Sequence, residues 1–269
     1  MATDLHMPPT VTEVANAEGA AATLAAAAAL TRAGGIALVR QWAIGNELPQ
    51  SLGALGPVFE PVALPPDKEF GAATHIAESG VLASATSWHH DQSFATNPPT
   101  WSALLCDNPG QSPVPTYFCD GAALLSLLSP GFRSTLSTLT ARHEAWYDLN
   151  VDPKDRPGHV HPVVIPVEGG VHALFVSPAT VEVFDGWRLQ ESLPVLDRLF
   201  SMMNWPEVTV GHTWARGDLL IWPNRRYLHR TLPLDSGRRT RRLIRVVGHW
   251  WDGRQEDTSG SATESPSTA

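Results

Sequence analysis

The sequence contains little cysteine and little lysine. Its 269 residues include two cysteines, Cys106 and Cys119, and no CxxC spacing. We therefore expect neither a disulfide framework nor a zinc site built from thiolates. Lysine occurs twice among 19 basic residues, which face 27 acidic ones and leave a formal net charge of -8. This balance disfavours a broad nucleic-acid-binding face, since such a face needs excess positive charge.

Long hydrophobic runs are also missing. The longest apolar run, Ala20 to Leu30, is mostly alanine and too short to span a bilayer. Residues 1–12 lack the basic and then apolar segments of a secretion signal, so we expect a cytoplasmic protein without a membrane partner. At 43% hydrophobic residues the chain can bury a sizeable core. We expect one domain over residues 13–251, with unstructured segments at 1–12 and 252–269.

Many short strands and few helices predict a mainly β fold, either a sandwich or a jelly roll with helices packed outside. An irregular, proline-rich loop is expected over residues 51–79. The expected strands cover residues 36–42, 87–95, 101–106, 115–119, 172–176, 219–222 and 239–247, and the expected helices cover 13–33, 121–141 and 189–203.

The clearest chemical pattern is Trp88-His89-His90-Asp91. On a strand, His89 and Asp91 would point to the same face, and together they supply two of the three ligands of a 2-His-1-carboxylate iron site. His229 follows a hydrophobic strand and a turn, and it is the candidate for the third ligand. A second histidine pair, His159 and His161, lies among prolines and glycines and is interpreted as part of a surface loop.

Arginines on one face of a late strand form a second pattern. Alternation over residues 239–247 places Arg239, Arg241 and Arg245 together with Leu243. Arginine is well suited to hold the carboxylate of a 2-oxo acid bound to the metal, because its planar fork matches a carboxylate. The same charges could instead protect an edge strand from aggregation.

Taken together, these motifs resemble the taurine dioxygenase and TfdA-like family of Fe(II)/2-oxoglutarate-dependent oxygenases. The block W-H-x-D-x-[ST]-F stands at residues 88–94, and a second block, from Trp214 through Asp218, Trp222 and Asn224 to His229, completes the pattern. The resemblance covers most of the chain. It implies a double-stranded β-helix, a jelly roll of the cupin kind, with flanking helices.

The resemblance also implies roles for individual residues. His89, Asp91 and His229 would hold Fe(II), while Thr116 and Arg241 would bind 2-oxoglutarate, with O2 as the other cosubstrate. Substrate contacts would come from Arg245, Gln92 and Trp88. The implied activity is oxidation, foremost hydroxylation, of an unactivated C–H bond in a small molecule, with conversion of 2-oxoglutarate to succinate and CO2.

Two positions narrow this expectation. The taurine enzyme has an amide side chain at the position of Ala85, so taurine itself is disfavoured as the substrate. Asp91 disfavours halogenation, because halogenases of similar fold replace this carboxylate with a small residue that leaves room for chloride. Arg245 still favours an anionic substrate, amino-acid-like or an intermediate of specialised metabolism.

Three alternatives remain at the level of the sequence. The same cofactors support desaturation, cyclisation or epimerisation. A jelly-roll protein could bind a metal without turnover, and a cupin-type zinc hydrolase would not need 2-oxoglutarate. The cosubstrate pair Thr116 and Arg241 distinguishes the oxygenase from the last two. Whether the protein forms a homo-oligomer is left open.

Overall fold

The computed structural model describes residues 8–16, 19–42, 48–56, 73–76, 83–110, 113–145, 152–232 and 241–250. The expected tail at 252–269 and most of the loop expected at 51–79 lie outside these residues, as does Arg239. No helix in the described part of the chain is both long and apolar enough to cross a membrane.

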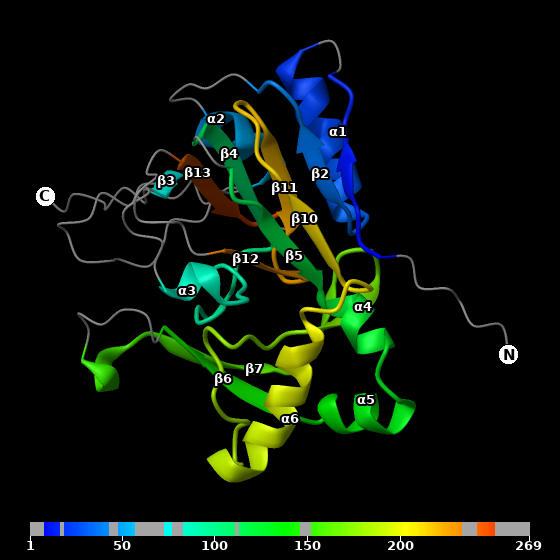
Figure 1. The fold of residues 1–269 in the computed structure, drawn as a ribbon, viewed down its shortest axis with the longest axis vertical. Helices are drawn as coiled ribbons and strands as arrows, with labels where there is room; N and C mark the ends of the chain where they lie inside the picture. The colour runs from blue at the N-terminus through cyan, green and yellow to red at the C-terminus, as the bar shows by residue number, and fades with distance from the viewer. Residues whose placement is uncertain are drawn as a thin grey trace, which may run out of the picture.

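Two sheets form the centre of the described structure (Figure 1). The larger has the strand order β1-β2-β11-β4-β13-β3, and the smaller has the order β10-β5-β12. The bounds of the first are β1 Val11–Glu13, β2 Ile36–Val39, β3 Ala73–Ile76, β4 Trp101–Pro109, β11 Leu219–Pro223 and β13 Arg241–Gly248. Those of the second are β5 Thr116–Asp120, β10 Thr209–His212 and β12 Tyr227–Thr231. This arrangement confirms the predicted mainly β jelly-roll class.

The space between the sheets is filled by alternate side chains of both. Leu104, Trp222 and Leu243 from the large sheet meet Phe118 and Tyr227 from the small one in one buried cluster. Because strand side chains alternate between faces, the other faces carry further apolar residues that need cover. Helices and hairpins supply this cover on both sides.

Two sets of elements cover the outer faces. The large sheet packs against α1 (Ala20–Arg32), α2 (Leu48–Leu52) and the 3-10 turn Gly53–Leu55. The small sheet packs against α4 (Gly121–Ser126), α5 (Pro130–Leu136), α6 (Leu189–Met202) and two strand pairs, of which β6 and β7 are labelled at the lower end of Figure 1. These strands are β6 Thr140–Glu144, β7 Gly158–Pro162, β8 Val164–Val167 and β9 Val171–Leu174. The short segments α3 (Ala83–Thr86) and η3 (Pro153–Asp155) complete the described elements.

Several predicted elements are confirmed with shifted ends. The predicted helix 13–33 begins only at Ala20, although it does end before Gly34, whose φ of 94° is the left-handed conformation expected there. Val11 and Thr12, expected to be unstructured, pair with β2 as part of β1. Besides the backbone pairing, Val11 packs against the core and Glu13 pairs with Arg40, contacts that are not visible in the sequence of this short segment.

Two other predictions were wrong. The single helix over 121–141 is divided, because Ser129 caps a new helix and Pro130 occupies its first turn. Residues 87–95 do not form a strand: His89 makes one isolated bridge to His229, and a turn follows from Asp91. The turn changes how Asp91 is held, as described below.

Candidate active site

His89 and His229 are joined through their backbones. The amide of His89 donates to the carbonyl of His229 at 3.1 Å, and the amide of His229 donates back at 2.8 Å. Residues that exchange both bonds lie directly opposite each other, so their side chains leave the backbone on the same face. The two imidazole rings accordingly lie with their centroids 4.1 Å apart.

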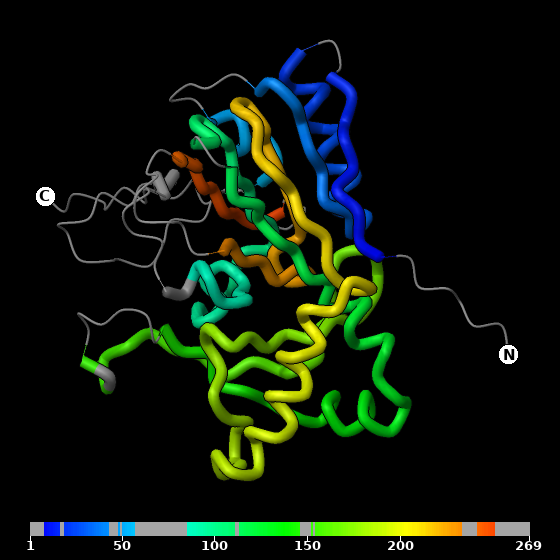
Figure 2. Tube along the Cα trace, viewed as in Figure 1, coloured from blue at the N-terminus to red at the C-terminus, as the bar shows by residue number. Residues whose placement is uncertain are grey.

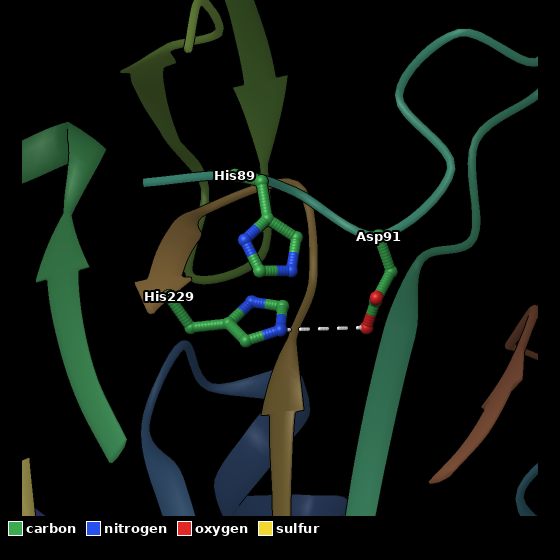
Figure 3. A group of neighbouring side chains, drawn as sticks. All are labelled: His89, Asp91 and His229. Atoms are coloured by element: carbon green, nitrogen blue, oxygen red, sulfur yellow. Dashed lines mark ion pairs between the residues drawn. The ribbon is translucent and has the colours of Figure 1, made fainter. Parts of the chain in front are cut away.

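Asp91 reaches the same point from the turn that follows. Its carboxylate accepts a hydrogen bond from the hydroxyl of Ser102 on β4 at 2.8 Å and pairs with the guanidinium of Arg245 on β13. Oδ2 of Asp91 lies 3.8 Å from Nε2 of His229, the contact drawn as a dashed line in Figure 3. One donor atom from each of His89, Asp91 and His229 lies within 4.8 Å of the others, which makes them the candidate metal group of the described residues.

The protonation states of the three side chains suit a metal. Burial lowers the pKa of His89 and lowers that of His229 to about 3, so both rings are neutral at neutral pH. Burial raises the pKa of Asp91, but Arg245 and the two histidines lower it by more. The net pKa of Asp91 therefore lies well below its usual range, and the group is a carboxylate. Nδ1 of His89 bonds the carbonyl of Ser87 at 2.9 Å, which leaves Nε2 for a metal. Two neutral imidazoles and one carboxylate are the donor set that fits Fe(II) with open positions.

A buried arginine, Arg241 of β13, reaches from the large sheet to the small one. Arg241 donates to the hydroxyl of Thr231 at 2.8 Å and to that of Thr116 at 3.1 Å. Thr116 also accepts from Trp214 at 2.9 Å. Burial lowers the pKa of Arg241 to about 10, and no carboxylate pairs with it among the described residues. A buried cation is costly unless an anion compensates it, so Arg241 is a candidate for binding an anionic ligand.

The residues expected to contact substrate lie in different surroundings. Arg245 faces the metal group but is paired with Asp91, and its side chain remains 26% exposed. Gln92 has a φ of 51°, and its amide oxygen is buried without a hydrogen-bond partner. Trp88 packs in the cluster outside the small sheet, donates to Asn204 at 3.1 Å and lies under Arg230. Substrate contact by these three residues stays a prediction, and the surroundings of Trp88 give it no support.

The interpretation of His159 and His161 as a surface loop was wrong. Both lie on β7, and His161 is buried, with its Nε2 2.9 Å from the carbonyl oxygen of Ala95. Their partners come from distant parts of the chain, including His143 on the neighbouring strand, so local composition could not show them.

Sequence reasoning also missed two residues that hold Asp91. Ser102 gave no signal, because a serine in an apolar strand is unremarkable. Asn224 stands in the sequence block that leads to His229. Its contact with Asp91, 133 residues earlier in the chain, could be identified only from the structure. Its side chain is fully buried and bonds the backbone of Asp91.

The two sheets form a jelly roll that carries a candidate metal group, His89, Asp91 and His229, and a buried cation, Arg241. The family described as "Taurine catabolism dioxygenase TauD, TfdA family" matches residues 11–247 of the chain. The protein therefore belongs to this family, as the sequence motifs indicated.

Individual relatives are more distant. Pentalenolactone F synthase of Streptomyces arenae is 26% identical over 181 residues, covering 60% of each chain. The alpha-ketoglutarate-dependent 2,4-dichlorophenoxyacetate dioxygenase of Burkholderia sp. strain RASC is 28% identical over 171 residues, which are 60% of this chain and 58% of that protein. The matches thus span less than two thirds of these relatives.

A solved structure supports the fold over a longer stretch. A taurine dioxygenase from Burkholderia xenovorans superposes with a TM-score of 0.69 at 24% identity, covering 90% of this chain and 88% of that one. At this identity the likeness concerns the fold, and the chemistry must be argued from the site itself.

Proposed function

We propose that this protein is an Fe(II)/2-oxoglutarate-dependent oxygenase acting on a C–H bond of a small anionic molecule. The observation that carries the proposal is the buried Arg241, which has hydroxyl partners but no carboxylate partner among the described residues. A protein that only bound a metal, or a zinc hydrolase, would have no use for this buried cation.

The chain would hold both cofactors through residues already described. His89, Asp91 and His229 would hold Fe(II) on one face, and the remaining positions would stay open for 2-oxoglutarate and O2. Arg241 and Thr116 would bind the far carboxylate of 2-oxoglutarate by charge-assisted hydrogen bonds. When bound, these cofactors supply the oxidation of the C–H bond, and 2-oxoglutarate is converted to succinate and CO2.

Other residues keep the site dry and oriented. The rings of Phe118 and Trp222 lie 6.2 and 5.0 Å from that of His229 and form an apolar wall behind it. Excluding water strengthens the electrostatic interactions inside and protects a reactive site from side reactions. Ser102 and Arg245 fix the carboxylate of Asp91 from two sides.

The anionic substrate is inferred from Arg245. One of its terminal nitrogens contacts Asp91, and the exposed part of the guanidinium retains further donors for a carboxylate or sulfonate. The name of one relative describes such a substrate, 2,4-dichlorophenoxyacetate, which carries a carboxylate. The cytoplasmic location expected from the sequence stays a prediction.

Anaerobic titration tests the proposal. Fe(II) followed by 2-oxoglutarate should produce the weak visible charge-transfer band of a chelated 2-oxo acid, and Arg241→Ala should require far more 2-oxoglutarate to reach it. If wild-type protein shows no band at saturating cosubstrate, the proposal is wrong.

Turnover provides the second test. His89→Ala, Asp91→Ala and His229→Ala should each abolish succinate release, while Arg245→Ala should alter the substrate requirement more than that for 2-oxoglutarate. Full activity in any of the three ligand variants would refute the ligand assignment. Analysis of the organic product separates hydroxylation from desaturation, cyclisation and epimerisation, which use the same cofactors.

A further inference from the structure

The backbone of Asp91 has no strand neighbour to satisfy it. Because a turn begins at this residue, the hydrogen bonds that a sheet would provide are missing. Asn224 supplies them from its side chain: Oδ1 accepts from the Asp91 amide at 2.9 Å, and Nδ2 donates to the Asp91 carbonyl, also at 2.9 Å. One amide group thus replaces two bonds of a β-ladder.

The side chain of Asn224 has little capacity for anything else. Its Nδ2 also donates to the carbonyl of Pro99 at 3.0 Å, so both of its protons are used. The residue is fully buried. Asn224 is therefore neither a metal ligand nor a substrate contact, and its effect must pass through the residues that it holds.

The segment held by Asn224 is strained. Gln92, next to Asp91, has a φ of 51°, a conformation that a side chain with a Cβ adopts at a cost of about 1 kcal/mol or more. Such a conformation persists when its neighbours are fixed on both sides. Asn224 fixes Asp91 on one side, and the hydroxyl of Ser93 lies 3.1 Å from that of Thr180 on the other.

Asn224 is also tied to the strand that carries His229. It lies in the turn between β11 and β12, and its own amide donates to the carbonyl of Thr100 at 2.9 Å. The preceding Pro223 is paired with Trp101 of β4. A single turn therefore contacts Asp91 through Asn224 and leads directly into the strand of His229.

We propose that Asn224 is a positioning residue of the metal centre, which fixes the carboxylate ligand Asp91 relative to His229 before a metal binds. This inference rests on the proposed function, because it assumes that the triad holds a metal. Partners that orient ligands in this way typically contribute 10- to 100-fold to metal affinity.

The test compares two variants that each leave a buried backbone amide without its side-chain acceptor, although Asn224→Ala also removes two donated bonds. Asn224→Ala leaves the buried amide of Asp91 without an acceptor. Ser192→Ala in α6 does the same to the amide of Phe184, which donates to the Ser192 hydroxyl at 3.1 Å. Neither residue belongs to the metal group. Co(II) affinity is titrated in each folded protein well below its melting temperature, with Asp91→Ala as the variant that lacks a ligand.

We expect Co(II) to bind Asn224→Ala roughly 10- to 100-fold more weakly than wild type, and Ser192→Ala to bind it normally although both melt earlier. Unchanged affinity in Asn224→Ala would overturn the inference. Wild-type protein that binds no Co(II), or binds it independently of Asp91, would instead contradict the proposed function.

A measurement on the unaltered chain covers the case in which Asn224→Ala does not fold. If Asn224 holds Asp91 in place before a metal binds, the amide of Asp91 should be protected from hydrogen exchange in the metal-free protein. Rapid exchange that slows only after Co(II) is added would show that the metal, and not Asn224, orders this segment.

Discussion

Two histidines outside the metal group, His143 and His161, lie against Phe175 in the covering layer. His143 is fully buried, with its Nε2 3.2 Å from the Phe175 carbonyl oxygen and its Nδ1 3.2 Å from the Thr180 hydroxyl. Burial lowers the pKa of His143 to about 3 and also lowers that of His161. No local pattern indicated either role, since a histidine in a loop and a histidine in a core are the same residue in a sequence.

Acid should destabilise the protein through these histidines. In the unfolded chain these histidines titrate near pH 6.5. Below that pH the unfolded state therefore binds protons that the folded state does not bind. The stability that His143 contributes is complete above about pH 6.5 and falls as the pH drops towards 3, by up to about 1.4 kcal/mol per pH unit. The contribution of His161 changes in the same direction. Melting temperatures of metal-free protein between pH 8 and pH 5 measure this fall.

His143→Gln provides the comparison. Its melting temperature should depend less steeply on pH than that of wild type, because one of the protons bound on unfolding is removed. Parallel curves for the two proteins would show that the buried ring of His143 does not contribute to the acid sensitivity.

Among the secondary-structure elements, β5 connects Thr116, which accepts from Arg241, with the covering helices. The strand begins with Thr116 and ends with Asp120, whose carboxylate accepts from the amides of Ala122 and Ala123 at 2.9 and 3.2 Å and so caps α4. The same carboxylate pairs with Arg226 at 2.8 Å. One side chain therefore stabilises the helix start and joins it to the turn before β12.

Substitution of Asp120 should separate these two contributions. Asp120→Asn keeps a capping oxygen and loses the ion pair, whereas Asp120→Ala loses both and should reduce the free energy of unfolding by roughly 3 kcal/mol. Denaturant unfolding measures both variants. A loss below about 0.5 kcal/mol in Asp120→Ala would mean that neither contact contributes as described, since exposed surface changes have effects of that size.

Strand periodicity succeeded for β13 and failed around Asp91 for different reasons. The register of β13 against β4 shifts between Arg242 and Leu243, but the extra residue, Asp107, belongs to β4. Alternation along β13 is therefore intact, and Arg241 and Arg245 share the inner face as predicted. Around Asp91 the sequence pattern of a strand was present, but contacts from Asn224 stabilise a turn, and such contacts over a long sequence distance leave no local trace.

At the scale of the whole molecule, the metal centre lies against the core between the sheets. Phe118 and Trp222 belong to that core and also contact His229. The alternating apolar strands predicted this core and its fold class, and the ordered motifs predicted all three members of the metal group. The burial of Arg241, and the absence of a carboxylate partner for it in the described part of the chain, required the structure, because both depend on what surrounds the side chain.

Ligand binding should therefore stabilise the entire fold. Co(II) with 2-oxoglutarate, each at about 100 times its dissociation constant, should add about 2.7 kcal/mol per ligand to the free energy of unfolding. For a chain of this size that corresponds to a rise in melting temperature of roughly 5 to 10 °C for each ligand, measurable by calorimetry. Asp91→Ala should lose most of the rise, and an equal rise in that variant would place the metal elsewhere.

The order of strands in the large sheet has a consequence for synthesis of the chain. The strand β4 lies between β11 and β13, so Trp101 pairs with Pro223 on one side and Gly248 on the other, as the adjacent tubes of β4 and β11 illustrate (Figure 2). Contacts between residues so far apart in the sequence form late, and they reduce the folding rate. A nascent chain that exposes His89 and Asp91 but has not yet reached His229 lacks one member of the candidate metal group. The proposed oxidation would therefore have to wait until translation has passed β12.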